Sequence, residues 1–204
     1  MTECCQPETT LRQVDELEKE IRKKREELNN LLKILHKKDV SDYQFTNHEG
    51  KKVELSKLFG TKDDLIVIHN MGQRCPSCTM WADGFNGIVD HLQDRAAFVV
   101  ISNDDIDVQK KFKAERGWKF PMVSAKDTSF FEDLGFARPA DSPEAKEKGR
   151  FGPGISTFKK QANGKITRVT SRIFGPGDDF CTTWHIFDLL SNGSNGWEPK
   201  FRYS

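Results

Sequence analysis

The sequence lacks a long apolar run and an excess of charge of either sign. Its 204 residues include 32 Lys and Arg against 31 Asp and Glu, a formal net charge of +1. Such a chain has no overall field that would attract nucleic acid or anionic lipid. The first ten residues, MTECCQPETT, contain no apolar signal region, and no stretch is long enough to span a membrane. We therefore expect a cytoplasmic protein that binds neither nucleic acid nor membrane.

Cysteine is also scarce, with five residues in a chain long enough to bury one core without disulfide bonds. In a reducing compartment, a close cysteine pair is more often catalytic or metal-binding than structural. A structural zinc ion normally has four protein ligands, and the sequence contains only one Cys-x-x-Cys motif. Cys181 and His185 lie one helical turn apart and offer two further ligands, but packing explains them more simply. We therefore predict neither a metal nor another cofactor. The cysteines are Cys4, Cys5, Cys75, Cys78 and Cys181.

A long amphipathic helix is predicted from Leu11 to Lys38, where Thr10 and Gln13 resemble a capping box at its start. Its apolar residues follow the alternating three-four spacing of a helical seam, with Lys24 at the one polar position. They are Val14, Leu17, Ile21, Leu28, Leu31 and Leu35. The favoured interpretation is a helix packed on its own domain, because about three heptads make a short coiled coil. The alternative is a coiled-coil contact in a homodimer.

Strands and helices alternate after this helix. DYQFT and KKVEL, on either side of the turn NHEG, predict a β-hairpin. Leu65 to His69 is a continuous apolar run, typical of a strand buried on both faces in a parallel sheet. A helix is predicted from Pro76 to Leu92, then the strand AAFVVIS, and then a helix that ends at Gly117. This strand-helix order indicates parallel strands joined by right-handed crossovers.

The last third of the chain predicts further short elements. A strand is expected at FPMVS, a short helix at SFFEDL, and an exposed loop from Ala137 to Gly149. ISTFKK and ITRVTSRIF predict an antiparallel hairpin across the turn QANGK. We expect Asp178 to cap a final helix that carries Phe180, Trp184 and Phe187.

The stretch QRCPSCTM places Cys75 and Cys78 three residues apart, directly after a predicted buried strand. Both sulfurs should then lie near a helix amino terminus, where unpaired backbone N–H groups stabilise a thiolate. Arg74 should add to this effect, and Pro76 suits the first helical position because it has no N–H to leave unpaired. Thiolate is the form that attacks a disulfide, and the spacing allows the two sulfurs to close a small ring. The pattern therefore indicates a redox-active dithiol.

The chain resembles a bacterial thioredoxin-like family of largely uncharacterised proteins that are predicted dithiol-disulfide oxidoreductases. The matching stretches are YQFTNHEGKKVELSKLFG, CPSCTMWADGFNG, RGWKFPMVSA, GPGISTF and FDLL. The resemblance implies an α/β thioredoxin-like fold, in which a central mixed sheet is flanked by helices and preceded by a β-hairpin. We expect residues 1–39 to form a disordered tail and the amphipathic helical extension, and residues 40–204 to form the domain.

Two positions differ from the thioredoxin pattern. Thioredoxins carry a buried Asp six residues before their first active-site cysteine, where this chain has His69, so the resemblance implies that His69 shuttles the proton of Cys78 near neutral pH. The alternative is a hydrogen-bonded core histidine. Thioredoxins also place a cis-proline opposite the cysteine pair, where this chain has Ser156 beside Thr157. A cis bond before a residue other than proline costs about 2.5–4 kcal/mol, so we expect a trans bond and a different groove.

The predicted reaction is attack by Cys75 on a disulfide, followed by resolution by Cys78. The expected partners are a disulfide-bearing protein or a small thiol substrate, together with a reducing system. The predicted groove residues are Arg74, Pro76, Ser77, Ser156 and Thr157. Two secondary candidates follow the motif: Trp81, more simply a core residue, and Asp83, two turns past Cys75.

Two other functions stay open. Peroxiredoxins share the fold, but they carry Pro seven residues and Thr three residues before the attacking cysteine, where this chain has Ile68 and Gly72. In the last alternative the domain is a non-catalytic scaffold that binds a partner through its amino-terminal helix.

Overall fold

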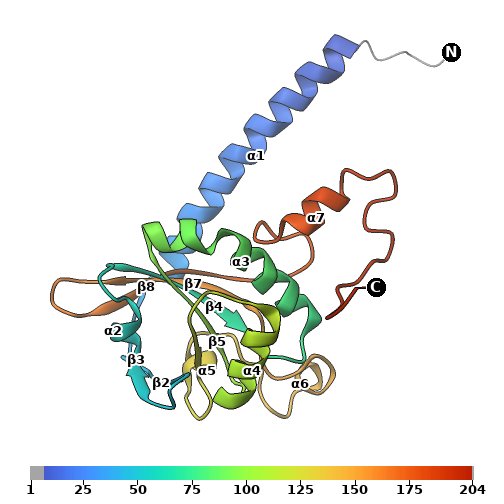
Figure 1. Ribbon diagram of the computed structural model, residues 1–204. Coiled ribbons are helices and arrows are strands. Elements are labelled where there is room, and N and C mark those ends of the chain that lie inside the picture. Colours follow the sequence, from blue (N-terminus) through green and yellow to red (C-terminus); the bar gives the residue numbers. More distant parts are fainter. Residues whose placement is uncertain (1–6, 204) are drawn as a thin grey trace.

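The computed structural model describes residues 7–203 and shows one curled eight-stranded sheet with helices on both faces (Figure 1). The strands lie in the order β1-β8-β7-β4-β5-β6-β2-β3, and β4, β5 and β6 are parallel to one another. The remaining neighbours pair antiparallel. The strands are β1 (Lys38–Val40), β2 (Gln44–Asn47), β3 (Lys52–Glu54), β4 (Asp64–Asn70), β5 (Ala97–Ser102), β6 (Met122–Ser124), β7 (Gly154–Lys160) and β8 (Ile166–Ile173). The helices are α1 (Pro7–His36), α2 (Leu55–Leu58), α3 (Pro76–Arg95), α4 (Ile106–Arg116), α5 (Phe130–Asp133), α6 (Pro143–Lys148) and α7 (Thr182–Phe187).

The predicted thioredoxin-like fold class is confirmed. Both hairpins form, β2 with β3 and β7 with β8, and the units β4-α3-β5 and β5-α4-β6 have the predicted parallel strands. Gly117 ends α4 in a left-handed conformation, with φ 66°. None of the helices within residues 7–203 is long and apolar enough to cross a membrane.

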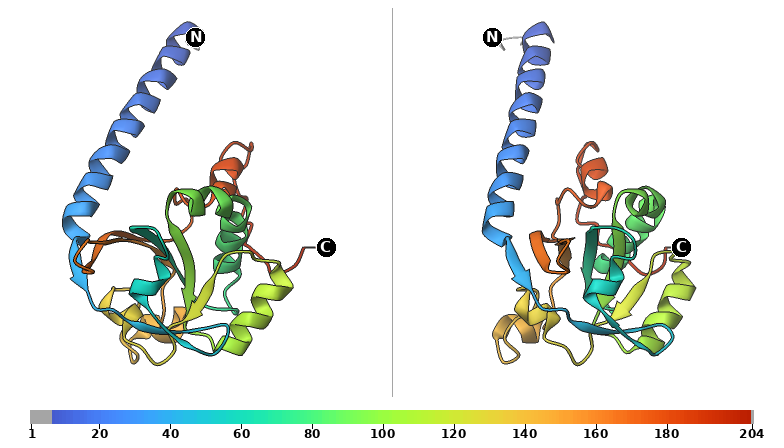
Figure 2. Two further views of the ribbon diagram at one scale, coloured as in Figure 1. Left: turned by 60° about the vertical axis from the view of Figure 1, so that its left-hand side comes forward. Right: turned by 90° about the vertical axis from the view of Figure 1, so that its left-hand side faces the viewer.

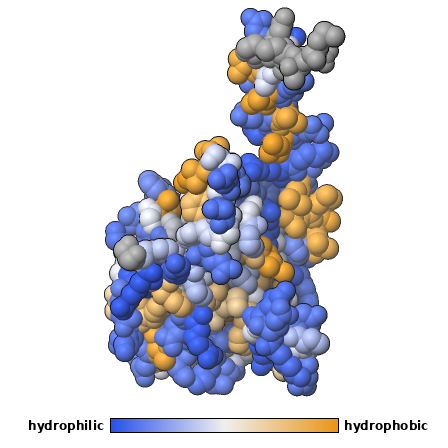
Figure 3. All heavy atoms as spheres, turned by 90° about the vertical axis from the view of Figure 1, so that its right-hand side faces the viewer, coloured by the Kyte–Doolittle hydropathy of each residue, from blue (hydrophilic) through white to orange (hydrophobic). Residues whose placement is uncertain are grey.

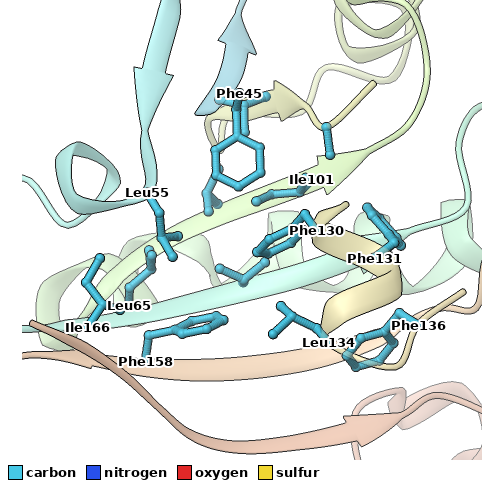
Figure 4. Packing of buried hydrophobic residues seen from close by; sticks show 14 of the residues in the cluster. Phe45, Leu55, Leu65, Ile101, Phe130, Phe131, Leu134, Phe136, Phe158 and Ile166 are labelled. Carbon is cyan, nitrogen blue, oxygen red and sulfur yellow. The ribbon is translucent and has the colours of Figure 1, made fainter. Parts of the chain in front are cut away.

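The sheet separates two hydrophobic clusters. On one face, α5 and its following turn pack on the sheet and form the α5-face cluster, shown in Figure 4. Its members include Phe45, Leu65, Val67, Phe130, Phe131, Phe136 and Phe158. On the other face, α3 and α4 cover the sheet and form the α3-face cluster. Its members include Ile68, Trp81, Phe85, Phe98, Trp118, Phe120 and Phe174. Both faces of the central strands are therefore buried, as expected for parallel strands.

Helix α1 projects away from the body, and only its last turns touch the sheet (Figure 2). At its end, Arg168 of β8 donates to the His36 carbonyl at 3.1 Å, and the Ser171 N–H donates to the His36 ring at 3.2 Å. The seam residues are exposed, with Leu17 at 58% and Leu31 at 64%. The favoured interpretation, in which the seam packs on the protein's own domain, is therefore wrong. The spacing of apolar residues predicted the helix but could not say what covers it.

Several boundaries also differ from the predictions. Helix α1 begins at Pro7, so Thr10 lies inside the helix and caps nothing. The helix ends at His36, and the charged segment Lys38–Val40 becomes β1 because β8 offers it an edge to pair with. This strand crosses the predicted domain boundary after residue 39. Residues 1–6, with the predicted disordered tail and Cys4 and Cys5, lie outside the described residues.

The predicted loop from Ala137 to Gly149 contains a helix. Ser142 caps α6 by accepting from the Ala145 N–H at 3.1 Å, and Pro143 occupies the first helical position. Asp178 does not cap α7, because its carboxylate accepts from the Gly175 and Phe180 N–H groups and closes the preceding turn. Phe180 therefore lies before the helix.

Candidate active site

The loop between β4 and α3 brings Cys75 to the end of the sheet. Gly72 has φ +100°, a conformation that other residues rarely adopt, and the Asp104 carboxylate fills the space where a side chain would begin. The Gly72 N–H donates to the Asn70 side chain at 2.7 Å, and the Gln73 N–H donates to Asp104 at 2.8 Å. The loop is therefore closely held in front of the cysteine.

Cys75 is the residue that caps α3. Its sulfur accepts the Cys78 backbone N–H at 3.1 Å. The hydrogen bond from the Cys78 thiol lowers the pKa of Cys75 most, burial opposes it, and the backbone N–H groups of Cys78 and Ser77 lower it further. Arg74 is not among the groups that shift this pKa, contrary to the expectation from the sequence. A half-buried thiol with a lowered pKa is suited to nucleophilic attack.

Cys78 has the opposite properties. Only 2% of its surface is exposed, and its pKa is raised well above its usual range by the hydrogen bond to Cys75 and by burial. Both cysteines are free thiols. The pair is therefore asymmetric, with one accessible sulfur that favours the thiolate and one covered sulfur that keeps its proton.

A cavity of about 520 Å³ opens beside Cys75. Arg74 and Pro76, two of the predicted groove residues, line this cavity, and its opposite wall is formed by the end of α6 and the residues that follow it. The lining residues are Met71, Arg74, Cys75, Pro76, Lys148, Gly149, Arg150 and Phe151. The sequence analysis missed the wall from Lys148 to Phe151. Its only local signal is the basic cluster KEKGR, which does not reveal that the segment faces a cysteine some seventy residues away.

A second cavity, of about 490 Å³, lies beside Pro76 and Ser77 on a different side of the helix start. Its walls are aromatic and proline-rich and come from α3 and the carboxyl-terminal segment. They include Trp81, Pro176, Trp184, Trp197 and Pro199. Of the predicted groove residues, Ser77 therefore lines this second cavity and Pro76 lines both.

His69 lies on the face of the sheet opposite α3. Side chains alternate along β4, and Leu65 and Val67 belong to the α5-face cluster, whereas Ile68 packs under α3. The His69 ring stacks on Phe136 with centroids 3.7 Å apart, and its Nε2 atom is 2.8 Å from the Ser156 hydroxyl. Within the described residues, no hydrogen bond joins His69 to either cysteine.

The environment of His69 contradicts proton exchange near neutral pH. Complete burial, with a smaller effect from Arg168, lowers its pKa to about 3. The imidazole is therefore neutral at pH 7 and cannot supply a proton to the cysteine pair at that pH. His69 is therefore a hydrogen-bonded core histidine, which is the alternative that the sequence analysis kept open.

Ser156 and Thr157 do not line either cavity beside the cysteine pair. Ser156 is completely buried against His69, and Thr157 points to the other face of β7, towards a cavity that Asn29 and Lys33 of α1 help to line. All peptide bonds of residues 7–203 are trans, as expected at Ser156. The groove prediction failed here because β7 begins at Gly154, which places Ser156 inside the strand.

The two secondary candidates have structural contacts. Trp81 is buried, stacks on Phe174, and donates its indole N–H to Asp178 at 3.4 Å. Asp83 pairs with Arg116 and accepts the Trp118 indole N–H at 2.8 Å, so it joins α3 to α4. Neither residue lines the cavity at Cys75.

The residues of the suggested metal site do not form a ligand group. Cys181 is buried and precedes α7, and a ring nitrogen of His185 lies 3.1 Å from the Asp178 carbonyl. Within residues 7–203, no three His, Cys, Asp or Glu side chains are placed to hold a metal ion.

Several solved structures resemble this chain. Peroxidoxin BcpB from Mycobacterium tuberculosis has a TM-score of 0.53 at 21% identity, covering 68% of this chain and 84% of its own. Reduced Prx3 from Vibrio vulnificus, in complex with H2O2, has a TM-score of 0.54 at 15% identity, covering 69% and 88%. A peroxiredoxin Q mutant from Xylella fastidiosa has a TM-score of 0.52 at 16% identity, covering 67% and 84%. At these identities the likeness shows a shared thioredoxin-like fold and no more.

The sequence comparisons place the chain in a family. No curated protein matches it. The pattern of the family DUF899, described as a bacterial protein of unknown function, matches residues 9–202, which is nearly the whole chain. The protein therefore belongs to the DUF899 family.

Proposed function

We propose that this protein is a thiol-disulfide oxidoreductase whose redox centre is the pair Cys75 and Cys78. The observation that carries the proposal is their asymmetry. The pKa of the half-buried Cys75 is lowered and that of the buried Cys78 is raised, and a cavity opens beside the first sulfur. This is the arrangement that a nucleophile and a resolving thiol require.

The reaction begins when the Cys75 thiolate attacks one sulfur of a substrate disulfide. A Cys75–substrate disulfide forms, the substrate S–S bond breaks, and one substrate thiolate leaves. The Cys78 thiol loses its proton to the leaving thiolate and attacks the Cys75 sulfur. This step closes a Cys75–Cys78 disulfide and releases the second half of the substrate as a thiolate, which takes a proton from solvent. Two electrons pass from the protein to the substrate, so an external dithiol must reduce the pair again.

A peroxidase is the second candidate, because solved peroxiredoxin structures share the fold. The loop before Cys75 argues against it. Residue 72, where peroxiredoxins carry Thr, is a Gly with φ +100°, and Asp104 fills the space that a side chain would need. A threonine cannot take this conformation without strain. The chain therefore lacks a group that helps peroxiredoxins to bind peroxide.

Cysteine substitutions test the proposal against both alternatives. With 2-hydroxyethyl disulfide as substrate and dithiothreitol as reductant, Cys75→Ser should abolish turnover above the uncatalysed rate. When the disulfide is added to the protein without dithiothreitol, Cys78→Ser should accumulate a mixed disulfide on Cys75 that mass spectrometry detects. Cys181→Ser, another substitution of a buried thiol, serves as the control and should keep full activity. Peroxide turnover with a sulfenic acid on Cys75 would support the peroxidase, and inert thiols would support the scaffold.

The free thiols of the described cysteines and the need for a reducing partner favour the cytoplasm as the working compartment. The substrate is a disulfide-bearing protein or a small thiol compound. In this proposal the catalytic domain begins with β1 at Lys38, and helix α1 before it is an extension with a separate role.

That role is self-association through the exposed seam of α1. Figure 3 shows apolar side chains on the surface of this helix. An apolar groove runs along it, lined by Leu17, Ile21 and Leu28, and charges of both signs border it at Glu20, Lys24 and Arg25. A second copy of the helix presents the same apolar seam, and its acidic and basic border residues can pair with the border residues of opposite charge on the first copy.

Sedimentation tests the dimer. Ile21→Glu, in the seam, should convert a dimer to a monomer, whereas Lys19→Gln, which changes the net charge by the same one unit outside the groove, should not. A monomeric wild-type protein at micromolar concentration would contradict self-association and leave α1 to a different partner.

A further inference from the structure

The cavity at Cys75 is lined by cations. Among residues 7–203, Arg74, Lys148 and Arg150 are the only charged residues that line it apart from the cysteine itself. The whole chain is almost neutral, with a formal charge of +1. The positive charge at Cys75 is therefore a local feature of the fold and does not reflect composition.

The cationic wall is held in place by backbone contacts. Arg138 donates its guanidinium to the Gly149 carbonyl at 3.0 Å and to the Phe151 carbonyl at 3.2 Å. Its backbone N–H donates to the Arg150 carbonyl at 2.7 Å, and Ala137 forms a β-bridge with Phe151. The backbone from Gly149 to Phe151 is therefore held by contacts within the protein, and Lys148 directly precedes it.

Nearby acids neutralise only part of this charge. Glu132 pairs with Arg150, and the charge of Arg74 acts on Asp104, whose pKa burial raises. Within the described residues, Lys148 forms no ion pair. None of the three cations is among the groups that lower the pKa of Cys75.

We propose that the substrate is the disulfide of a small thiol that carries carboxylates. This inference rests on the proposed function and narrows its substrate class. A cavity of about 520 Å³ is of the size that holds a small molecule, and guanidinium groups bind carboxylates through paired hydrogen bonds. The steps and the electron balance are those of the exchange described above. Each turnover consumes one substrate disulfide and releases two carboxylate-bearing thiols.

Three small disulfides of different charge test the inference with the full-length protein. They are glutathione disulfide, which is anionic, 2-hydroxyethyl disulfide, which is neutral, and cystamine, which is cationic. For each disulfide, the rate with the protein is divided by the rate of its uncatalysed reaction with dithiothreitol. This ratio corrects for differences in intrinsic reactivity among the three disulfides. We expect kcat/KM for glutathione disulfide to exceed that for cystamine by about tenfold or more at low salt, and the ratio to fall as salt is added.

Lys148→Glu should lower kcat/KM for glutathione disulfide several-fold more than it lowers kcat/KM for the neutral disulfide, because only the anionic substrate loses an attractive charge. The matched control is Lys146→Glu, which makes the same charge change on the same helix at an exposed residue that does not line the cavity. It should leave the preference intact.

The outcomes separate this inference from the proposed function. Turnover of all three disulfides with no charge preference, or an equal effect of both lysine variants, would overturn the inference alone. A preference for disulfides in proteins over all three compounds would also overturn it and direct attention to the aromatic cavity beside Ser77. Failure to reduce even 2-hydroxyethyl disulfide, with Cys75 intact, would overturn the proposed function as well.

Discussion

The two faces of the central sheet carry different buried polar groups. On the α3 face, Cys75 and Cys78 form a thiol pair whose two pKa values shift in opposite directions and whose first sulfur borders a cavity. On the α5 face, His69 and Ser156 form a hydrogen-bonded pair enclosed by phenylalanine rings. His69 lies only six residues before Cys75 in the chain, but the sheet separates their side chains. A titratable residue that is close to a reactive cysteine in sequence therefore need not take part in the chemistry of that cysteine.

We expect the α5 face to govern stability and the α3 face to govern thiol reactivity. The largest effect should come from Phe130→Ala, because Phe130 is fully buried and its ring packs on Tyr43, Phe45 and His69. Loss of such a ring costs about 3–5 kcal/mol of the free energy of unfolding. Urea denaturation should show this loss, whereas the alkylation rate of Cys75 in the folded protein should not change. Phe201→Ala, at a partly exposed phenylalanine, should cost less than about 1 kcal/mol.

The next effect concerns pH. The pKa of His69 is about 3 in the folded protein, and the usual value of 6.5 applies when the chain unfolds. Below pH 6.5 the unfolded state binds a proton that the folded state does not, so stability falls as the pH drops from about 6.5 to about 3. The contribution is on the order of 4 kcal/mol at the low end of this range.

His69→Gln removes the titrating group but keeps a partner for Ser156. The variant should therefore lose less stability than the wild type between pH 6.5 and pH 4, as measured by urea denaturation at each pH. His91→Gln, at an exposed position of α3, should follow the wild-type curve. A pH profile of disulfide exchange that changes in His69→Gln would instead restore His69 to the chemistry.

Ser156→Ala should have a smaller effect. It leaves the Nε2 atom of His69 without a partner in a ring whose Nδ1 atom already has none. An unsatisfied buried group of this kind costs about 1–3 kcal/mol. Thermal and urea unfolding should show this cost, while exchange activity stays near the wild-type level. A large loss of activity would return Ser156 to the substrate groove.

The smallest effect on stability should come from Cys78→Ala, but it should be the clearest effect on reactivity. Removing the Cys78 thiol removes the largest contribution to the lowered pKa of Cys75. The pKa should rise, and alkylation of Cys75 at pH 6–7 should slow several-fold. Mass spectrometry of the Cys75 peptide follows the reaction, with Cys181→Ala as the control. An unchanged pH profile would assign the acidity of Cys75 to the backbone N–H groups alone.

The sequence analysis found the elements that local patterns encode. The parallel strands, helices α3 and α4, both hairpins and the position of the cysteine pair at the start of α3 follow from apolar spacing, Pro76 and Gly117. It missed β1, whose residues Lys38–Val40 form a strand only because β8 is beside them. It also missed α6, although Ser142 and Pro143 are a recognisable helix start.

Assigning side chains to faces was beyond the reach of local patterns. Leu65, Ile66, Val67 and Ile68 are all apolar, so their sequence does not say which face α3 covers. His69 was therefore assigned to the cysteine pair only through the resemblance to thioredoxins, which carry a buried Asp at that position. The cavity wall from Lys148 to Phe151 could not be predicted either, because no local sequence pattern links this segment to Cys75.

The amino-acid sequence alone determined most of the strands and helices and their order along the chain, the presence of the long amino-terminal helix and the dithiol at a helix start. These features depend on periodicity, backbone preference and spacing within a few residues. Only the tertiary structure decided that His69 is a neutral core residue, that the α1 seam is left uncovered and that cations face Cys75. Each of these depends on which segments distant in the chain meet in space, and the packing of the whole sheet determines that.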